Sequence, residues 1–151
     1  MQLTLFAYGN PSRGDDALAP ELLHLFEHSE VYNSKKINLL TDFQLQIEHA
    51  LDLEQTEMAM FIDASIDCEK SFCFNQLIAE QDVTYTSHAL HPKEILYVYE
   101  QITHRSPPPC FLLTIRGYAF ELGEPLSVGA STNLALAFNF LTQWVQQLVY
   151  E

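Results

Sequence analysis

An acidic turn directly follows the first apolar segment of the chain. The run LTLFAY at 3–8 leads into GNPSRGDD at 9–16. The two glycines have the spacing of the phosphate-binding loop G-x-x-x-x-G-K-S/T, but Asp15 and Asp16 stand where that loop needs a lysine and a hydroxyl. Because two carboxylates repel a phosphate, this turn favours a cation as its ligand.

Two side chains later in the chain could bind the same cation. Asp63 ends the apolar run MAMFID, and His88 lies in the segment TSHAL. Two carboxylates and one imidazole form a hard-to-borderline ligand set, which suits a divalent metal and leaves coordination positions open. The residue types therefore predict a metal-contacting site.

Each of these residues also has an ordinary structural explanation. Asp15 or Asp16 could cap the helix that follows, and Asp63 could be a loop residue. His91 is the one rival ligand to His88, but its place beside Pro92 is typical of a helix start. The remaining histidines are expected at the surface: His24, His28, His49 and His104.

Alternating strands and helices are predicted to position these groups. Short apolar runs predict strands at 3–8, 36–40, 58–63, 71–77 and 110–115. Helical periodicity predicts helices after the acidic turn, at 44–53, after Pro92, and from a cap at Ser131, Thr132 or Asn133 to the end of the chain. This order indicates an α/β fold, a single three-layer domain with a mostly parallel twisted sheet of about five strands and helices on both faces.

The predicted fold brings the candidate residues together. In an open α/β sheet, ligands bind beyond the carboxyl ends of the strands. Asp16 follows the first predicted strand, Asp63 ends the third, and His88 precedes the third predicted helix. We therefore expect the three side chains to converge at this edge of the sheet.

Composition narrows the possible partners and the compartment. Seven Lys and Arg stand against 20 Asp and Glu, a net charge of −13, which would repel nucleic acid and anionic membranes. The N-terminal segment lacks a basic region, and no run approaches the length of a membrane span, so a cytoplasmic protein is expected. Cys68, Cys73 and Cys110 have no metal-binding spacing, and buried thiols are the interpretation we favour.

Three motifs, in their order, resemble those of the nickel-iron hydrogenase maturation endopeptidases: GNPSRGDD, FIDAS and TSHAL. Those enzymes trim the C-terminus of the hydrogenase large subunit after nickel is inserted. The resemblance includes LTDFQLQIEHALDLE at 40–54 and IRGYAFELGEPLS at 115–127, so it spans nearly the whole chain. It looks closest to the members that serve bidirectional, NAD(P)-linked hydrogenases.

The resemblance implies roles for individual residues within one domain over 1–151. Asp16, Asp63 and His88 match the metal-contacting positions of the family, and Asp16 and Asp63 are candidates for the catalytic residues. Three further residues from the same motifs are predicted to bind substrate: Asn10, Asp15 and Asp42. The implied cation is nickel carried by the hydrogenase large-subunit precursor, and three mixed ligands predict only weak affinity for nickel in the free enzyme.

Two stretches depart from the family pattern. Many members have glycines directly after the acidic pair, where this chain has Ala17, Leu18 and Ala19. Many also have Asp-Gly-Gly-Thr after the second strand, where this chain has TDFQ at 41–44. The first difference alters the helix start, and the second removes flexible glycines from a loop near the implied substrate site.

Several mechanisms and two other functions fit the sequence. The metal could polarise the scissile carbonyl, it could serve only as a mark of nickel insertion, or an aspartate could activate a water. A phospho-receiver module also has an acidic pair after its first strand, but it needs a lysine where this chain has Ile115, Arg116 and Gly117. A catalytically silent metal- or partner-binding α/β module is the other alternative.

Overall fold

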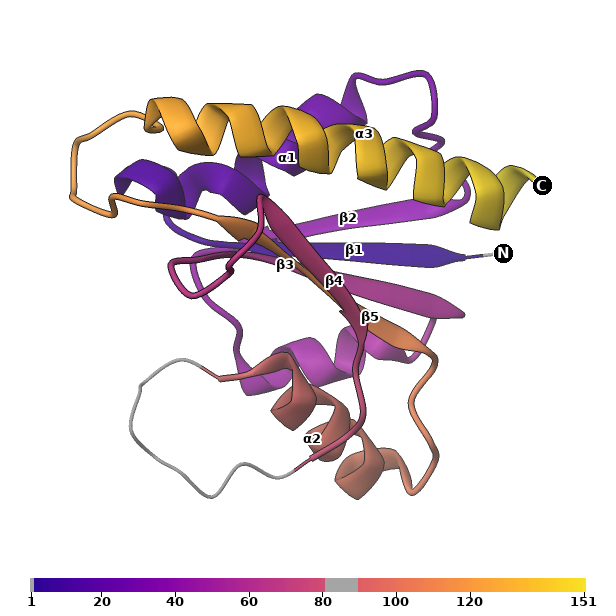
Figure 1. Ribbon diagram of the computed structural model, residues 1–151. Helices are drawn as coiled ribbons and strands as arrows, with labels where there is room; N and C mark the ends of the chain where they lie inside the picture. The colour runs from indigo at the N-terminus through magenta and orange to yellow at the C-terminus, as the bar shows by residue number, and fades with distance from the viewer. Residues whose placement is uncertain (1, 81–89) are drawn as a thin grey trace.

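Five strands form the sheet of the computed structural model, which describes residues 2–80 and 90–151 (Figure 1). The strands are β1 (Leu3–Tyr8), β2 (Ile37–Asp42), β3 (Met58–Ser65), β4 (Phe72–Gln76) and β5 (Cys110–Arg116). Their order is β2-β1-β3-β5-β4. All neighbouring pairs are parallel except β4 with β5, so the sheet is mostly parallel, as predicted from the sequence.

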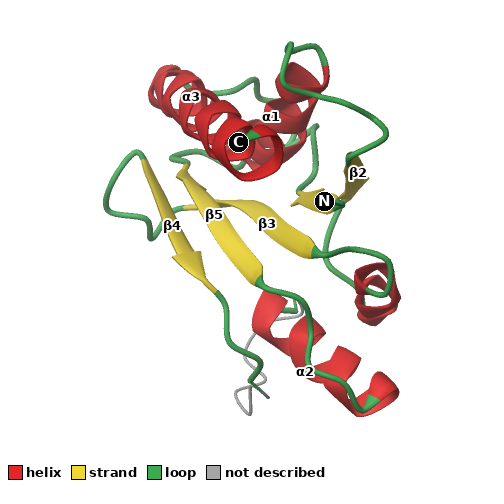
Figure 2. Ribbon diagram, turned by 90° about the vertical axis from the view of Figure 1, so that its right-hand side faces the viewer, coloured by secondary structure: helices red, strands yellow, loops and turns green. Residues whose placement is uncertain are grey.

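Helices cover both faces of the sheet. The α-helices are α1 (Leu18–Glu27), α2 (Pro92–Thr103) and α3 (Val128–Tyr150), and two 3-10 helices are η1 (Gly14–Ala17) and η2 (Ile47–Leu53). Figure 2 shows α1 and α3 on one face, with α2 and η2 on the other. This single three-layer α/β domain confirms the predicted fold class.

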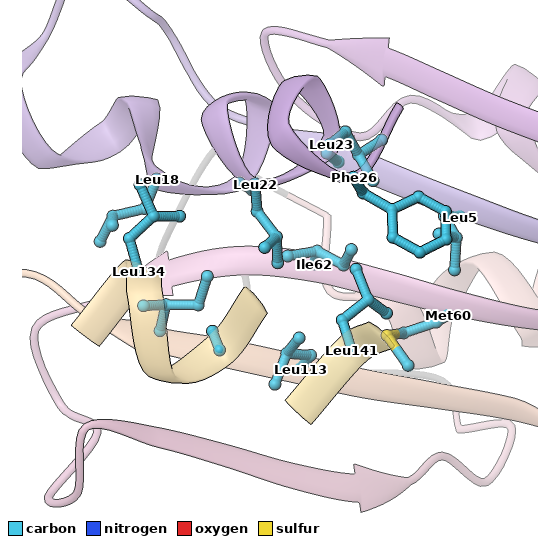
Figure 3. Packing of buried hydrophobic residues seen from close by; sticks show 14 of the residues in the cluster. Leu5, Leu18, Leu22, Leu23, Phe26, Met60, Ile62, Leu113, Leu134 and Leu141 are labelled. Carbon is cyan, nitrogen blue, oxygen red and sulfur yellow. The ribbon is translucent and has the colours of Figure 1, made fainter. Parts of the chain in front are cut away.

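The central strands are apolar because both of their faces are covered. All six residues of β1 are buried. On one face, Leu22 and Phe26 of α1 and Leu141 of α3 pack with Ile62 of β3 in the main core (Figure 3). Burying a side chain of this size contributes about 1.5–3 kcal/mol. The core therefore fixes the strands whose ends carry the candidate site.

Three helix starts differ from the sequence prediction. The N-cap of α1 is Ala17, without a side-chain cap, because η1 lies between the acidic pair and the helix. The N-cap of α3 is Ser127, and its hydroxyl accepts the Ala130 N–H. The polar run Ser131 to Asn133 misled the prediction because it lies inside the first turns of α3. The segment predicted as a helix over 44–53 contains only the 3-10 helix η2.

No helix among the described residues combines the length and the apolar character that crossing a membrane requires.

Candidate functional site

Asp16 and Asp63 lie at the switch point of the sheet. From β1 the chain crosses through α1 to β2 on one side, while β3 pairs with the other side of β1. Ligands of α/β proteins bind in the crevice outside the strand ends at such a point. Asp16 lies in η1 just past β1, and Asp63 lies near the carboxyl end of β3, opposite Thr114 of β5. The predicted convergence of these two carboxylates is thus observed.

Gly9 explains how the loop brings Asp16 back over the end of β1. A Cβ at Gly9 would lie 2.1 Å from the carbonyl oxygen of Asp16, and its φ of +151° also disfavours a side chain. The next N–H, of Asn10, donates to Oδ2 of Asp16 over 2.6 Å. The Asn10 side chain accepts the N–H of Ser12, which tightens the same turn. The first glycine therefore serves a close backbone approach, and Asn10 helps hold Asp16.

Gly14 docks the acidic loop onto the connection between β5 and α3. Its φ is +54°, and a Cβ there would lie 2.5 Å from the carbonyl oxygen of Ala119. The Gly14 N–H donates to the carbonyl of Glu124, and the Gly123 N–H donates back to the carbonyl of Ser12. Figure 1 shows both connections at the same end of the sheet. Both glycines of the opening motif thus have structural roles.

Asp15 is the buried anchor between these two connections. Its side chain is 0% exposed and accepts four hydrogen bonds. The donors are the backbone N–H groups of Tyr118, Ala119 and Ser127 and the Ser127 hydroxyl, at 2.7–3.0 Å. Burial acts to raise the pKa of Asp15, but these hydrogen bonds outweigh it and the pKa is lowered. A carboxylate held in this way fixes the loop, and the structure offers no surface on which Asp15 could contact a substrate.

Asp63 has the opposite electrostatic environment. Burial raises the pKa of Asp63 to about 7, and the nearby charge of Asp16 adds to this rise. The hydrogen bond that it accepts from the Ala64 N–H, at 2.8 Å, acts in the other direction. Near neutral pH, Asp63 therefore exchanges between a carboxylic acid and a carboxylate.

Tyr8 is a neighbour of Asp63 that the sequence analysis did not single out. It is the last residue of β1 and only 8% exposed. Burial and the charge of Asp63 raise its pKa well above the usual value, so the phenol stays neutral. The sequence feature that could have identified Tyr8 as a site residue is its place at the end of an apolar central strand.

Asp42 ends β2 at the same edge of the sheet. It lies opposite Tyr8, and its carbonyl accepts the N–H of Gly9. One carboxylate oxygen accepts the Phe43 N–H, and the other is 3.5 Å from Nε2 of His49. His49 is not the surface residue that was predicted, since its side chain is only 17% exposed and packs edge-on against Phe6. The contact with His49 orients the Asp42 carboxylate beside the switch point.

The remaining candidates are His88 and its rival His91. His88 lies outside the described residues, so its convergence with Asp16 and Asp63 stays a prediction. His91 is the N-cap of α2, where Nδ1 accepts the Lys93 N–H and Glu94 completes a capping box. This confirms that His91 is a helix-start residue.

Arg116 stands where a phospho-receiver would need its lysine. Its guanidinium donates to the carbonyl of Cys68 over 2.7 Å and stacks on the ring of Tyr118. It therefore holds neighbouring loops in place, and the antiparallel β4 also differs from an all-parallel receiver sheet. Cys68 and Cys110 are buried, as the thiol interpretation expected, whereas Cys73 is only partly buried.

Comparison with known proteins gives matches in structure but not in sequence. No protein-family model matches the chain, and no curated protein matches it. The fold is similar to that of the NiFe hydrogenase maturation protease HycI from Thermococcus kodakarensis, with a TM-score of 0.73 and 14% identity over 96% of this chain and 92% of that one. It is also similar to the hydrogenase maturating endopeptidase HybD from E. coli, with a TM-score of 0.75 and 13% identity over 97% and 93%.

A third similar structure is an uncharacterized protein from Wolinella succinogenes, with 19% identity and a TM-score of 0.64 over 98% of this chain and 99% of that one. At such identities the likeness concerns the arrangement of the backbone. The chain therefore has the fold found in hydrogenase maturation proteases, over nearly its whole length.

Proposed function

We propose that this protein is an endopeptidase that removes the C-terminal extension of a hydrogenase large-subunit precursor once nickel has been inserted. The observation that carries the proposal is the pair Asp16 and Asp63 at the switch point, close enough for one charge to raise the pKa of the other. The shared fold with proteins described as maturation proteases supports it.

Nickel enters this site as part of the substrate. A divalent cation stabilises two carboxylates that repel each other at a partly buried site, because it neutralises both charges. We propose His88 as the third contact. The positions that these residues leave open would be filled by ligands on the precursor, so binding at the acidic pair tests whether nickel insertion has occurred.

Asp63 is the proposed acid–base residue. A pKa of about 7 matches the requirement that a general base titrate near the working pH. Its carboxylate can take a proton from a water that attacks the scissile carbonyl, and the resulting acid can return that proton to the leaving amine. Nickel either polarises the carbonyl or only marks a precursor that is ready to be cut.

Exposed apolar side chains next to the site favour a folded protein as substrate. Phe43 follows β2 and is 65% exposed, and Leu122 in the connection after β5 is 69% exposed. Both connections leave the carboxyl ends of parallel strands and so lie at the edge that carries Asp16 and Asp63. Such side chains gain free energy when a partner covers them, which an untethered peptide would do poorly.

The compartment and the kind of precursor are also part of the proposal. The net charge of −13 makes nucleic acid and anionic membranes unfavourable partners. We propose a cytoplasmic reaction on the precursor of a bidirectional, NAD(P)-linked hydrogenase.

The test is processing of a purified precursor, with and without nickel, followed by mass spectrometry of the released C-terminal segment. We expect cleavage of the nickel-loaded precursor, and none of the nickel-free precursor or of an isolated C-terminal peptide. His88→Ala should abolish cleavage, while His91→Ala, at a helix cap, should keep it. Cleavage of the nickel-free precursor at the normal rate would replace this picture with a peptidase that does not inspect nickel.

A further inference from the structure

A second group of metal-binding side chains lies on α1, outside the acidic site. Among the residues that the structure describes, one cluster of three His, Cys or acidic side chains has its ligand atoms within 4.8 Å of one another: His24, Glu27 and His28. All three side chains are exposed. The spacing i, i+3 and i+4 places them on one face of the last helical turn.

The hydrogen bond of His28 prepares its ring for metal binding. The backbone N–H of His28 bonds to the carbonyl of Leu25, so the last turn is tightened and the carbonyl of His24 is left for another donor. Nδ1 of His28 lies 2.8 Å from that carbonyl and donates its proton there. This fixes the tautomer in which Nε2 carries the free lone pair, as in histidines that bind metal.

The charges around the cluster also favour a cation. The cluster occupies the C-terminal end of α1, where the helix dipole is negative. The carboxylate of Glu27 adds a full negative charge, and the whole chain carries −13. A cation is therefore attracted before any coordinate bond forms.

The donor set selects the kind of metal. Two imidazoles and one carboxylate suit Zn²⁺, Ni²⁺, Co²⁺ and Cu²⁺, whereas Mg²⁺ and Ca²⁺ prefer oxygen ligands alone. We propose that His24, Glu27 and His28 form a binding site for one divalent transition-metal ion, with water in the remaining positions. This site is independent of the proposed peptidase function.

The proposed site is separate from Asp16 and Asp63. From Leu18 to His24 the helix rises about 9 Å, and α1 leads away from the carboxyl edge of the sheet (Figure 1). Its ligands also lie opposite the buried face that contains Leu22, Leu23 and Phe26. Removing a ligand should therefore leave both the core and the acidic site intact.

The test is calorimetric titration of the purified, chelator-treated protein with ZnCl₂ and NiCl₂. The variants are His24→Gln, His28→Gln and Glu27→Gln, with Glu21→Gln as the control for loss of one exposed charge on the same helix. We expect one metal per chain in the wild type, at least tenfold weaker binding in each histidine variant, a smaller loss in Glu27→Gln, and no change in Glu21→Gln. MgCl₂ should give no binding at this site.

A second measurement identifies the ligands directly. With Cu²⁺, electron paramagnetic resonance should show nitrogen coupling from two imidazoles in the wild type and from one in His28→Gln. Asp16→Ala with Asp63→Ala should leave both the calorimetric and the spectroscopic signals unchanged. The proposal is overturned if the wild type binds neither metal, or if the double aspartate variant removes binding while the histidine variants keep it.

Discussion

Asp15 and Asp16 are adjacent in the sequence, but they belong to two regions that affect the pKa of a buried carboxylate in opposite directions. Around Asp15, four donors converge on a buried carboxylate and lower its pKa. Around Asp16 and Asp63, the donors from residues 2–80 and 90–151 do not compensate for burial and mutual repulsion, and the pKa of Asp63 rises to about 7. The first region uses a carboxylate to stabilise the fold, while the second holds two carboxylates close together at an energetic cost, which the proposed function explains by a ligand that the substrate supplies.

The largest expected effect is the loss of activity when Asp16 or Asp63 is replaced. Asp63→Ala and Asp16→Ala should each lower precursor processing by about 10³-fold or more, roughly 4 kcal/mol in the transition state, because each removes a carboxylate that the proposed function places at the reacting centre. Neither variant should lose its fold, since neither side chain belongs to the core: in urea, Asp16→Ala should unfold within about 1 kcal/mol of the wild type, and Asp63→Ala should be at least as stable as the wild type.

Asp52→Ala is the matched control, because this exposed aspartate of η2 lies at the other end of the sheet, beside Gln2. It should process the precursor at the normal rate. An Asp63→Ala variant that retains most of the activity would show that Asp63 is not the catalytic carboxylate.

Replacing Asp15 should mainly lower the stability of the fold. Asp15→Asn should cost roughly 3 kcal/mol or more, because an amide offers one acceptor oxygen and turns its NH₂ group toward donors. Asp16→Asn should cost under about 1 kcal/mol. Urea unfolding measures both, and equal costs would mean that the four hydrogen bonds of Asp15 are not what holds the loop.

The pH dependence of Asp15 has a definite sign. Its pKa is lower in the folded protein, so its contribution to stability is fully present above the unfolded pKa of about 3.9 and is lost as pH falls through the folded value. The difference between wild type and Asp15→Asn should therefore be constant from pH 8 to pH 5 and shrink in acid.

Local patterns were sufficient to predict the sheet and the edge at which Asp16 and Asp63 meet. The apolar runs of β1 and β3 identified two central strands, and the acidic residues that follow or end these runs were Asp16 and Asp63. The alternation of strands and helices was sufficient for the fold class. These features depend on residues close together in the sequence.

The role of Asp15 could not be predicted in this way. Its partners, Tyr118 to Ser127, lie more than 100 residues away, and three of its four donors are backbone N–H groups, which carry no sequence signature. The start of α3 was missed for a related reason. Ser127 caps the helix while it also donates to Asp15, whereas the polar run after it looked like the more typical cap.

Asp63 should destabilise the folded protein at alkaline pH. Its pKa is raised on folding, so the penalty is absent below the unfolded pKa, develops as pH rises toward about 7, and is complete above it. Asp63→Asn, which carries no charge, should therefore be more stable than the wild type at pH 8, on the order of 2 kcal/mol, and similar to it at pH 4.

Thermal unfolding in the presence of a chelator measures this difference. Asp42→Asn serves as the control, because the partner of Asp42 is a histidine and not a second carboxylate, and it should give no gain at pH 8. A pH-independent difference between Asp63→Asn and the wild type would contradict the raised pKa.

The smallest effect should come from Ser127, the serine that joins Asp15 to the start of α3. In Ser127→Ala, the backbone N–H still donates to Asp15, but the hydroxyl bond to Asp15 at 2.7 Å and the cap that accepts the Ala130 N–H at 3.2 Å are lost. Removing an N-cap of this type costs about 1 kcal/mol, so the urea midpoint should fall modestly while processing continues. Ser131→Ala is the control, because Ser131 is exposed inside the first turns of α3 and should change stability by less than about 0.5 kcal/mol. If Ser131→Ala cost as much as Ser127→Ala, the helix in solution would begin where its sequence pattern suggested, and Asp15 would lose one of its anchors.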